Sequence, residues 1–519
     1  MNRPTAAAGA IHDAKRLRLQ AAGPGSGAIP TNVAFARGLP PEERARLGAI
    51  LRKPTRTLSG VAVVAVMTAP ARCPHGRCAY CPGGLEQRSP QSYTGEEPSA
   101  LRAHQFGWDA RAITAHRLET LEALGHPTSK VEVIVQGGTF PSRPWAHQEE
   151  VYRGIFDGLN GSRSASLGEA QARNETAARR LVGLTVETRP DWCDGRILPD
   201  LLAAGVTRVE IGVECLRDDV LERVGRAHGA AEVFRASREA RDRGLKLGYH
   251  LMLGLPGMDP ARDLEDFERI VSDPALSPDM LKLYPTLVLP DTALHAEFVA
   301  GRYTPYDTET AVRLLARMKP RIPPWIRIQR IQRDIPARLI AAGVRHGNLR
   351  QMAIAEMARS GERCRCLRCR EVGRRPVAPG AAFVPVERRY PASGGLEIFL
   401  SEEEPESEAV AGFLRLRFPS PETVGGLAAP VIRELKVLGP EVAIGLRPTD
   451  AASAGQHRGL GGRLLARAAA IAAEAGHRRL FVTSAVGTRP YYRRFGFLPE
   501  GPHLVASLPR DGRLPMRPA

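Results

Sequence analysis

The sequence predicts an α/β protein in which a partial barrel of six parallel βα units, resembling part of a TIM barrel, precedes a smaller α/β domain. Its 519 residues are too many for one hydrophobic core and correspond to two to four domains of ordinary size. Apolar runs alternate with helical segments from residue 61 onward, which is typical of parallel βα units. In the last third of the chain the pattern changes, and a glycine-rich loop leads into a helix.

Six apolar runs are the predicted barrel strands. The first, VAVVAVM from Val61 to Met67, is rich in β-branched residues, as expected of a strand buried on both faces. Amphipathic stretches such as Pro199–Ala204 and Ala231–Arg243 predict helices between later runs. Because parallel barrels gather ligands at the carboxyl ends of their strands, residues directly after each run are candidate site residues. The other runs are Val131–Gln136, Leu181–Glu187, Val206–Val213, Leu245–Leu253 and a segment that begins with Leu281–Tyr284.

The positive charge of the chain is unevenly distributed. The whole sequence has 73 Lys and Arg against 56 Asp and Glu, a net charge of +17 with neutral histidines. Residues 301–380 hold 18 basic and 6 acidic residues, a local charge of +12, whereas residues 401–519 hold 16 and 12, only +4. A uniform compositional bias does not produce such a concentration, so the distribution favours a surface that binds a phosphate backbone. A solvated basic linker is the alternative.

This basic region contains a candidate RNA-contacting segment, RIPPWIRIQRIQR, in which arginines are mixed with the aromatic Trp325. Cations combined with a stacking surface suit RNA, and no amphipathic apolar face accompanies them to suggest a membrane surface. No run approaches the roughly 18–20 apolar residues of a membrane span, and the first residues lack an apolar signal-peptide core. We therefore expect a cytoplasmic protein that binds RNA and no membrane. The candidate arginines are Arg321, Arg327, Arg330 and Arg333.

Six of the eight cysteines form two tight clusters, which in a reducing compartment favours metal ligation over disulfides. In the first cluster, CPHGRCAYCPGG, Cys73, Cys78 and Cys81 follow the first predicted strand. Three thiolates in one loop can hold three irons of a [4Fe–4S] cluster and leave the fourth iron open. That iron can chelate S-adenosylmethionine, whose reductive cleavage yields a 5′-deoxyadenosyl radical. A zinc site with His75 as its fourth ligand is the alternative.

A short glycine motif directly follows the second predicted strand, at Gly137, Gly138 and Thr139. Two glycines let a ligand approach the backbone closely, and the exposed peptide groups are candidates to bind the methionine part of S-adenosylmethionine. A plain turn is the alternative. The preceding strand and the cysteine loop favour the cofactor interpretation.

The second cysteine cluster, GERCRCLRCREVG, places Cys364, Cys366 and Cys369 within six residues. This spacing indicates a metal site, and four-coordinate Zn²⁺ needs one more ligand. His346 is the nearest upstream histidine and is the predicted fourth ligand, with Asp334 as its competitor. Three reduced structural cysteines are the alternative. Placed between two domains, such a zinc site would fix their orientation.

The last third of the chain carries a candidate nucleotide-binding loop. QHRGLGGRLL, which starts at Gln456, matches a pattern in which backbone N–H groups and a helix N-terminus hold a pyrophosphate. A strand with polar gaps, Val431 to Leu438, precedes the loop, and a helix, a strand at Leu480–Thr483 and the run YYRRFGF follow it. This order is similar to that of GNAT acetyltransferases, although packing in a core is the commoner role of such tyrosines. The resemblance implies acetyl-CoA contacts from Glu434, Leu435, Lys436, Val437, Gln456, His457, Arg458, Gly459 and Tyr492.

Seven segments together resemble the catalytic subunit of Elongator in its single-chain prokaryotic form, from about residue 50 to the end of the chain. The resemblance implies a radical S-adenosylmethionine domain joined to an acetyltransferase domain, and modification of the wobble uridine at position 34 of tRNA. It also singles out Lys130, which in relatives approaches acetyl-CoA from the radical domain; on sequence alone it is an ordinary lysine before a strand. Lys130 and Tyr492 are therefore the catalytic candidates. The segments are KPTRTLSGVAVVAVM, CPHGRCAYCPGG, KVEVIVQGGTF, ETRPDWC, RVEIGVE, RIQRDIP and HGNLR.

The motifs divide the chain into four predicted parts: a basic N-terminal segment (1–48), the radical domain (49–320), a basic zinc-binding linker that contacts tRNA (321–380) and the acetyltransferase domain (381–519). In the predicted reaction, the 5′-deoxyadenosyl radical activates the acetyl methyl group of acetyl-CoA, which adds to C5 of uridine 34 and leaves a carboxymethyl group. A radical enzyme of another RNA-modification class and a protein lysine acetyltransferase are the alternatives. The sequence does not identify the electron donor and leaves open whether the chain forms a homodimer.

Overall fold

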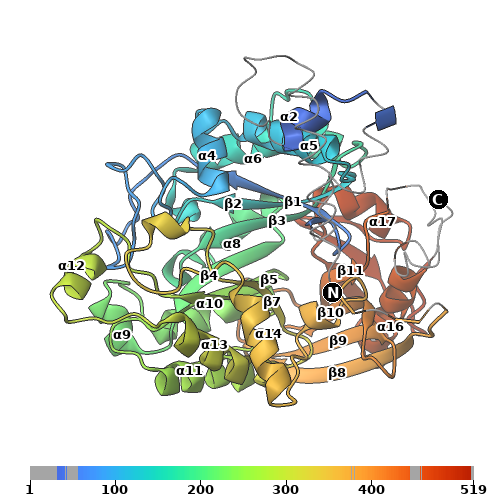
Figure 1. The fold of residues 1–519 in the computed structure, drawn as a ribbon. Helices are drawn as coiled ribbons and strands as arrows, with labels where there is room; N and C mark the ends of the chain where they lie inside the picture. The colour runs from blue at the N-terminus through green and yellow to red at the C-terminus, as the bar shows by residue number, and fades with distance from the viewer. Residues whose placement is uncertain are drawn as a thin grey trace.

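The computed structural model describes residues 32–40, 42–43, 56–375, 377–378, 380–442, 444, 456 and 459–515. Within these residues the strands form two seven-stranded sheets, which lie side by side (Figure 1). In the first sheet the strands follow chain order and every neighbouring pair is parallel. Its strands are β1 (Ala62–Met67), β2 (Lys130–Gln136), β3 (Arg180–Thr188), β4 (Arg208–Glu214), β5 (Lys246–Leu253), β6 (Met280–Pro285) and β7 (Arg327–Ile331).

Helices pack on the convex side of this curved sheet (Figure 1): α5 contacts β1, α6 contacts β3, and α10 contacts β4 and β5. Their starts follow ordinary capping chemistry: the Asp259 side chain accepts hydrogen bonds from two backbone N–H groups at the start of α11, where proline occupies the first turn. The helices are α2 (Asn32–Arg37), α4 (Pro98–Gln105), α5 (Ala110–Ala123), α6 (Trp145–Asn160), α7 (Leu167–Asn174), α8 (Leu198–Ala203), α9 (Asp218–Arg223), α10 (Ala230–Asp242), α11 (Pro260–Ser272), α12 (Ala293–Val299), α13 (Thr308–Met318), α14 (Leu349–Arg359) and α15 (Leu367–Arg370).

The partial parallel barrel is confirmed, and the structure adds a seventh strand to the six predicted. β7 comes from the segment that we assigned to the basic linker. Its sequence, RIQRI, reads as a basic surface, but Ile326 and Ile328 are fully buried and β7 pairs with β6 in parallel. The apolar signal is short because three of its five residues, Arg327, Gln329 and Arg330, are polar.

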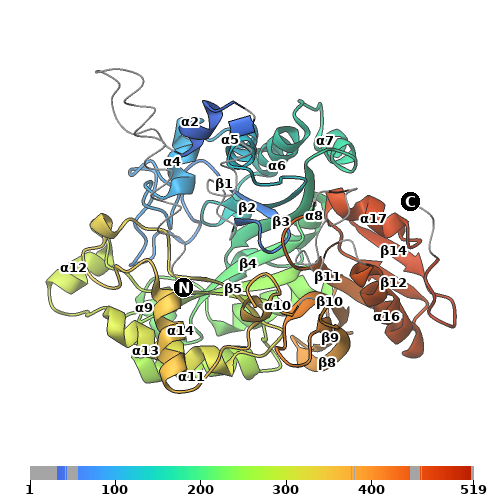
Figure 2. The same ribbon diagram turned by 45° about the vertical axis from the view of Figure 1, so that its right-hand side comes forward.

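The second sheet is mixed, with strand order β13-β14-β12-β11-β10-β9-β8, and α16 packs against its central strands. α10 of the barrel contacts β10 of this sheet, so the two halves share an interface (Figure 2). The elements are β8 (Val384–Ala392), β9 (Gly395–Glu403), β10 (Val410–Phe418), β11 (Val431–Val437), α16 (Leu460–Glu474), β12 (Arg479–Val482), α17 (Arg489–Arg493), β13 (Leu498–Glu500) and β14 (His503–Ser507). Among the described residues, no helix combines the length and apolarity that a membrane crossing requires.

Candidate active site

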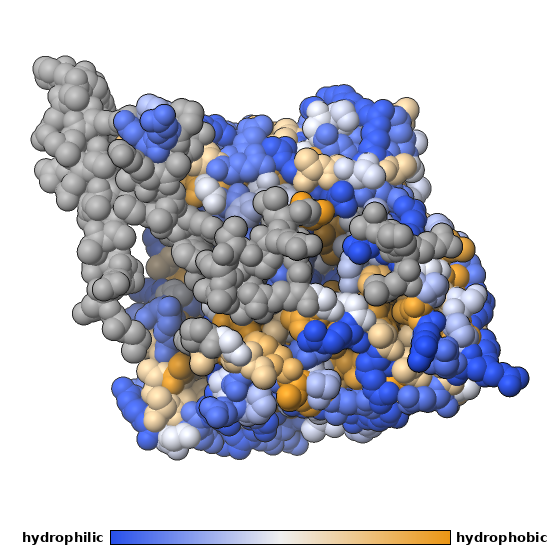
Figure 3. All heavy atoms as spheres, turned by 90° about the vertical axis from the view of Figure 1, so that its right-hand side faces the viewer, coloured by the Kyte–Doolittle hydropathy of each residue, from blue (hydrophilic) through white to orange (hydrophobic). Residues whose placement is uncertain are grey.

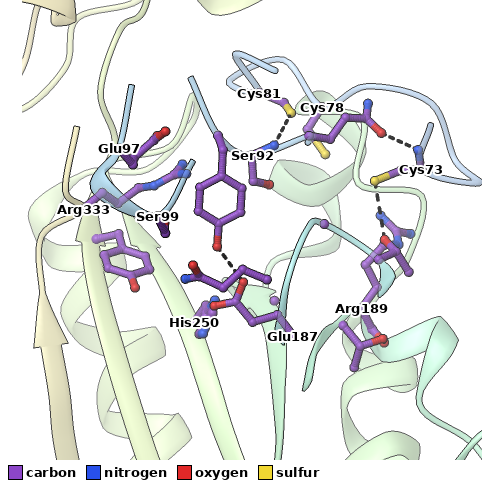
Figure 4. Close-up of a pocket in the computed structure, with 18 of the residues that line it drawn as sticks. Cys73, Cys78, Cys81, Ser92, Glu97, Ser99, Glu187, Arg189, His250 and Arg333 are labelled. Carbon is purple, nitrogen blue, oxygen red and sulfur yellow. Dashed lines mark hydrogen bonds between the residues drawn. The ribbon is translucent and has the colours of Figure 1, made fainter. Parts of the chain in front are cut away.

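A first cavity of about 280 Å³ lies at the carboxyl ends of the barrel strands (Figure 4). It is lined by Cys73, Cys78 and Cys81 from the loop after β1, and by Gly138 and Thr139 after β2. The structure therefore brings the predicted cysteine loop and the predicted glycine motif to the same place. The carboxyl-end location is the one expected for ligands of a parallel barrel.

Each cysteine sulfur of this loop has a polar neighbour. The backbone N–H of Ser92 donates to Cys81 Sγ at 3.0 Å, and the Thr139 hydroxyl donates to Cys73 Sγ at 3.5 Å. Arg226 Nη1 lies 3.8 Å from Cys78 Sγ. A backbone N–H, a hydroxyl and a guanidinium thus lie beside the three sulfurs, while burial raises the pKa of the Cys81 thiol to about 11. Iron binds the thiolate form.

The glycine motif fits this loop closely. Gly137 and Gly138 have φ values of +146° and +76°, a region that favours glycine. A Cβ atom on Gly137 would lie 2.1 Å from Thr68 Oγ1, and one on Gly138 would lie 3.4 Å from Cys73 Sγ. The backbone therefore runs directly beside the first cysteine, where a side chain on Gly137 would collide with its neighbour.

The sequence analysis missed a polar group at the floor of the first cavity. The Tyr93 hydroxyl donates to Glu187 at 2.7 Å, and Lys282 Nζ donates to the other oxygen of the same carboxylate at 3.2 Å. His250 Nε2 lies 3.1 Å from Glu210. Burial opposes ionisation of Glu187, but Lys282 and His250 hold its pKa below the ordinary value. Glu187 stands at the end of a predicted strand, and that position was the available signal.

A second, larger cavity of about 1230 Å³ lies at the amino ends of the barrel strands, against the second sheet. The barrel supplies Lys130, Glu132, Arg208 and Lys246, and β11 supplies Glu434–Val437. Hydrophobic residues gather across the middle of the face shown in Figure 3, on the side of the second sheet. The β11 residues that are predicted to bind acetyl-CoA therefore face the barrel across this cavity.

Lys130 joins the two halves of the molecule. Its Nζ donates to Gln456 Oε1 and to the Val442 carbonyl, each at 2.8 Å. Gln456 Nε2 in turn donates to the carbonyls of Gly60 and Val437, each at 3.3 Å. Burial lowers the pKa of Lys130 to about 8, against the opposing charge of Glu441. Lys130 thus lies beside Gln456, the first residue of the loop predicted to bind acetyl-CoA. His457 and Arg458 of that loop lie outside the described residues.

The backbone around the second cavity has the features that a pantetheine arm and a pyrophosphate need. β11 pairs with β12 only at Val431 and Ile432, so the strands separate before residues 434–437. On that side, the peptide groups of these residues have no partner in β12. Gly459 precedes α16 with a φ of +80°, so the chain turns sharply and exposes the helix N-terminus to the cavity.

Tyr492 lines the second cavity but is also part of the core. Its side chain is buried and makes edge-on contacts with the rings of Tyr491 and Phe497, at 5.4 and 5.9 Å between centroids. Burial raises its pKa above the ordinary value, so the hydroxyl stays protonated. Tyr491 also lines the cavity and was not singled out from the sequence.

The sulfurs of Cys364, Cys366 and Cys369 lie within 4.8 Å of one another, which suits one shared metal ion. His346 does not belong to this group: its ring is exposed and lies 3.0 Å from the Thr308 hydroxyl. The prediction of His346 as fourth ligand is therefore wrong for this arrangement.

Asp334, its competitor, pairs with Arg330 instead. Lys319 is fully buried beside the three thiols of the second cluster. The thiols also interact with one another, which raises the pKa of Cys364 and lowers that of Cys366. The three sulfurs therefore have a cationic neighbour but no identified fourth ligand among the described residues.

The four candidate arginines have different surroundings. Arg330 and Arg333 line the first cavity, and Arg333 lies over the Tyr93 ring at 5.7 Å. Arg321 is exposed and pairs with Glu268. Arg327 differs from the expectation: it is buried and paired with Glu371, which leaves no exposed guanidinium for a phosphate.

Comparison with known proteins agrees with this geometry. Residues 68–270 match the Radical SAM superfamily, and residues 278–359 match the Radical SAM C-terminal domain. The chain is 42% identical over 491 residues to the tRNA uridine(34) acetyltransferase of Methanocaldococcus infernus, covering 92% of each chain. It is 43% identical over 502 residues to the Elongator complex protein 3 of Danio rerio, covering 93% of this chain and 91% of that protein.

A solved structure also resembles it. The archaeal Elp3 of Methanocaldococcus infernus with an N-terminal deletion superposes with a TM-score of 0.76 at 36% identity, covering 87% of this chain and 100% of that one. The fold and the first cavity define a radical S-adenosylmethionine protein with a second α/β domain of the acetyltransferase type. The chain belongs to the family of Elongator complex protein 3 and the tRNA uridine(34) acetyltransferases.

Proposed function

We propose that this protein installs a carboxymethyl group at C5 of the wobble uridine of tRNA, with S-adenosylmethionine as the radical source and acetyl-CoA as the acyl donor. One observation carries the proposal: a three-cysteine cavity and a cavity suited to an acyl donor occupy opposite ends of one barrel. The names of its relatives, which include tRNA uridine(34) acetyltransferase, support the substrate. A protein lysine acetyltransferase would have no use for the first cavity.

The first cavity suits a [4Fe–4S] cluster together with S-adenosylmethionine. Three thiols face it, and the glycine motif leaves its backbone accessible beside Cys73. Bound there, the cluster and its ligand supply a radical able to take hydrogen from an unactivated methyl group. The protein holds the cluster through Cys73, Cys78 and Cys81 and the methionine part through Gly137, Gly138 and Thr139. Tyr93 and Glu187 offer polar contacts to a nucleobase at the cavity floor.

The second cavity suits acetyl-CoA. The edge of β11 that does not pair with β12 suits the pantetheine amides, and the N-terminus of α16 suits the pyrophosphate. Lys130 supplies a cation from the barrel side, and Tyr492 closes the wall beside β11. The role of the chain here is to bind and align the donor and to exclude water.

The arginines near the first cavity support contact with the anticodon loop. Arg330 and Arg333 line the cavity, and Arg321 is exposed nearby in sequence. Uridine 34 lies in a loop, so its base can leave the stack without the opening of a duplex. The arginines then need only to bind the phosphate backbone of the tRNA on either side of this uridine.

The test is mass spectrometry of wobble nucleosides from cells with and without the gene. We expect a C5-carboxymethyl-type uridine at position 34 to disappear with the gene and to return when the wild-type chain is supplied. An unchanged nucleoside profile would overturn the proposal.

We also propose that Cys364, Cys366 and Cys369 hold Zn²⁺ with a structural role. The backbone N–H of Leu367 donates to the Ile326 carbonyl at 2.9 Å, and that of Val372 donates to the Val410 carbonyl at 3.1 Å. The cysteine segment therefore attaches to the end of the barrel on one side and to the second sheet on the other. Cys366→Ser should lower bound zinc, and undiminished zinc would contradict the assignment.

A further inference from the structure

The two cavities lie along the same strands. On β2, Lys130 and Glu132 line the second cavity and Gln136 lines the first. On β5, Lys246 lines the second cavity and His250 the first. These residues share the concave face because side chains alternate along a strand. A strand advances about 3.3 Å per residue, so four residues separate the two sets by about 13 Å. We call the concave face between the cavities the lumen.

A single layer of side chains separates the two cavities. On each of four neighbouring strands, one residue of the concave face lines neither cavity and stands between residues that do. Ile134 stands between Glu132 and Gln136, and it is in register with Thr185 on β3. The middle layer consists of Ile134, Thr185, Glu210 and Gly248.

The two sides of this layer differ in their polar contacts. On the β4–β5 side, charged groups pair with one another: Glu210 pairs with Lys282 and lies 3.1 Å from His250. Glu210 Oε1 and Arg208 Nε form no hydrogen bond among the described residues, but they lie 3.2 Å apart as an ion pair. A Cβ on Gly248 would lie 3.1 Å from Glu210 Cγ, so the glycine leaves room for this carboxylate. This half of the lumen is filled by its own ion pairs.

On the β2–β3 side, polar atoms lack partners. Thr185 Oγ1 and Gln136 Oε1 are buried and have no hydrogen-bond partner among the described residues. Buried polar atoms without partners are rare and call for an explanation. A threonine hydroxyl can donate to an acyl carbonyl. From the second cavity toward the first, Thr185 of the middle layer comes before Gln136, which lines the first cavity.

Buried ion pairs hold the barrel and the second sheet together. They oppose any connection between the two cavities that would require these halves to separate. Arg433 of β11 donates to Asp279 before β6 at 2.7 Å, and Arg417 of β10 pairs with Asp242 at the end of α10 at 2.5 Å. All four side chains are fully buried. Breaking buried ion pairs leaves charges uncompensated, which is strongly unfavourable.

We propose that the acyl group of the donor in the second cavity reaches the first cavity through the lumen, between β2 and β3, past Thr185 and Gln136. The proposal rests on the proposed function for the presence of an acyl thioester in the second cavity. Thr185 is then a positioning residue: its small side chain keeps the path open and its hydroxyl meets the carbonyl in transit.

The experiment blocks the middle layer with Thr185→Met and uses Thr185→Val, which has nearly the same size, as the matched control. The full-length, anaerobically reconstituted enzyme is given tRNA, and three quantities are measured: the dissociation constant of S-adenosylmethionine, the dissociation constant of acetyl-CoA by calorimetry, and C5-modified uridine formed. Thr185→Met should lower the modified uridine at least tenfold and leave the other two within about twofold. Thr185→Val keeps the width of the path but removes the hydroxyl, so it should lower the product clearly less than Thr185→Met does.

Ile134→Phe narrows the same path from β2 and serves as the second variant. Full product yield in both blocking variants would overturn the route. Loss of S-adenosylmethionine binding and of acetyl-CoA binding in both variants would also count against it, because the layer would then be needed for structure. If the wild-type enzyme forms no C5-modified uridine, the proposed function itself fails, and that outcome is separate from the behaviour of the variants.

Discussion

Lys130 shows how one residue can link both halves of the molecule. It begins β2, yet its amino group contacts Gln456 and the carbonyl of Val442 in the second half of the chain. Burial favours the neutral amine and lowers its pKa to about 8. The charge of Lys130 is therefore lost at a pH well below that of an ordinary lysine.

This shift predicts the pH dependence of donor binding. Acetyl-CoA is anionic, so its affinity should fall as the pH rises through about 8 and Lys130 loses its proton. Lys130→Arg should reduce this fall, because a guanidinium stays protonated up to about pH 12. Lys246, which lines the same cavity and whose pKa burial also lowers to about 8, should retain part of the pH dependence. Calorimetric titrations from pH 6.5 to 9.5 check this expectation, and equal slopes for both proteins would contradict it.

At the scale of the element, strand β7 explains why the arginines of one basic segment have two different surroundings. Arg327 lies within the strand and pairs with the fully buried Glu371, whereas Arg330 and Arg333 lie toward and beyond its carboxyl end beside the first cavity. The spacing of the arginines in the sequence does not separate these roles. The pairing of β7 with β6 does, because it buries one end of the segment and leaves the other at the cavity.

The double variant Arg330→Ala/Arg333→Ala should weaken tRNA binding and reduce its salt dependence. Loss of two contacts to single-stranded phosphates lowers the slope of log K against log salt by about 1.4. Arg359→Ala removes an exposed arginine paired with Glu356 and is the control. The affinity for tRNA is measured at several salt concentrations. An unchanged slope would show that these two arginines do not contact the RNA.

Arg327→Met should act on stability instead. It removes one of the two arginines that pair with the buried Glu371 carboxylate and leaves Arg374 at 3.3 Å, so unfolding should become easier by about 3 kcal/mol. Denaturant titration measures this change. Loss of tRNA affinity in a variant of unchanged stability would contradict the assignment of Arg327 to the interior.

At the scale of the whole molecule, buried charges hold the two halves together. Asp279 lies 2.7 Å from Arg433 and 3.5 Å from Arg415, and all three side chains are fully buried. Burial opposes its ionisation, but the surrounding arginines hold its pKa well below the ordinary value. The interface therefore fixes the second cavity against the amino end of the barrel.

Asp279→Asn should destabilise the protein by about 3–5 kcal/mol, because the arginines lose their main counter-charge. Glu422→Gln removes the exposed partner of Arg238 and should cost less than about 1 kcal/mol. Chemical unfolding of both variants measures the difference. Equal stability of the two would show that the buried network contributes little.

Much of this molecule follows from local sequence signals. Strands such as Val61–Met67 and the loops after them were predicted because β-branched runs, cysteine spacing and paired glycines act over a few residues. The Tyr93–Glu187 contact and the lumen were not, because they join residues that are distant in the chain and meet only through strand register. The wrong assignment of His346 has the same cause: nearness in sequence did not bring its ring to the three sulfurs.

The central claim is that one chain couples the three-cysteine cavity to an acyl donor in order to modify uridine 34. The most direct measurement is anaerobic turnover of the reconstituted protein with tRNA, S-adenosylmethionine, acetyl-CoA and a reductant, followed by nucleoside mass spectrometry. The account predicts a C5-carboxymethyl-type product with the wild-type chain and none with Cys78→Ser. A Cys78→Ser protein that still forms the C5 product would contradict the account.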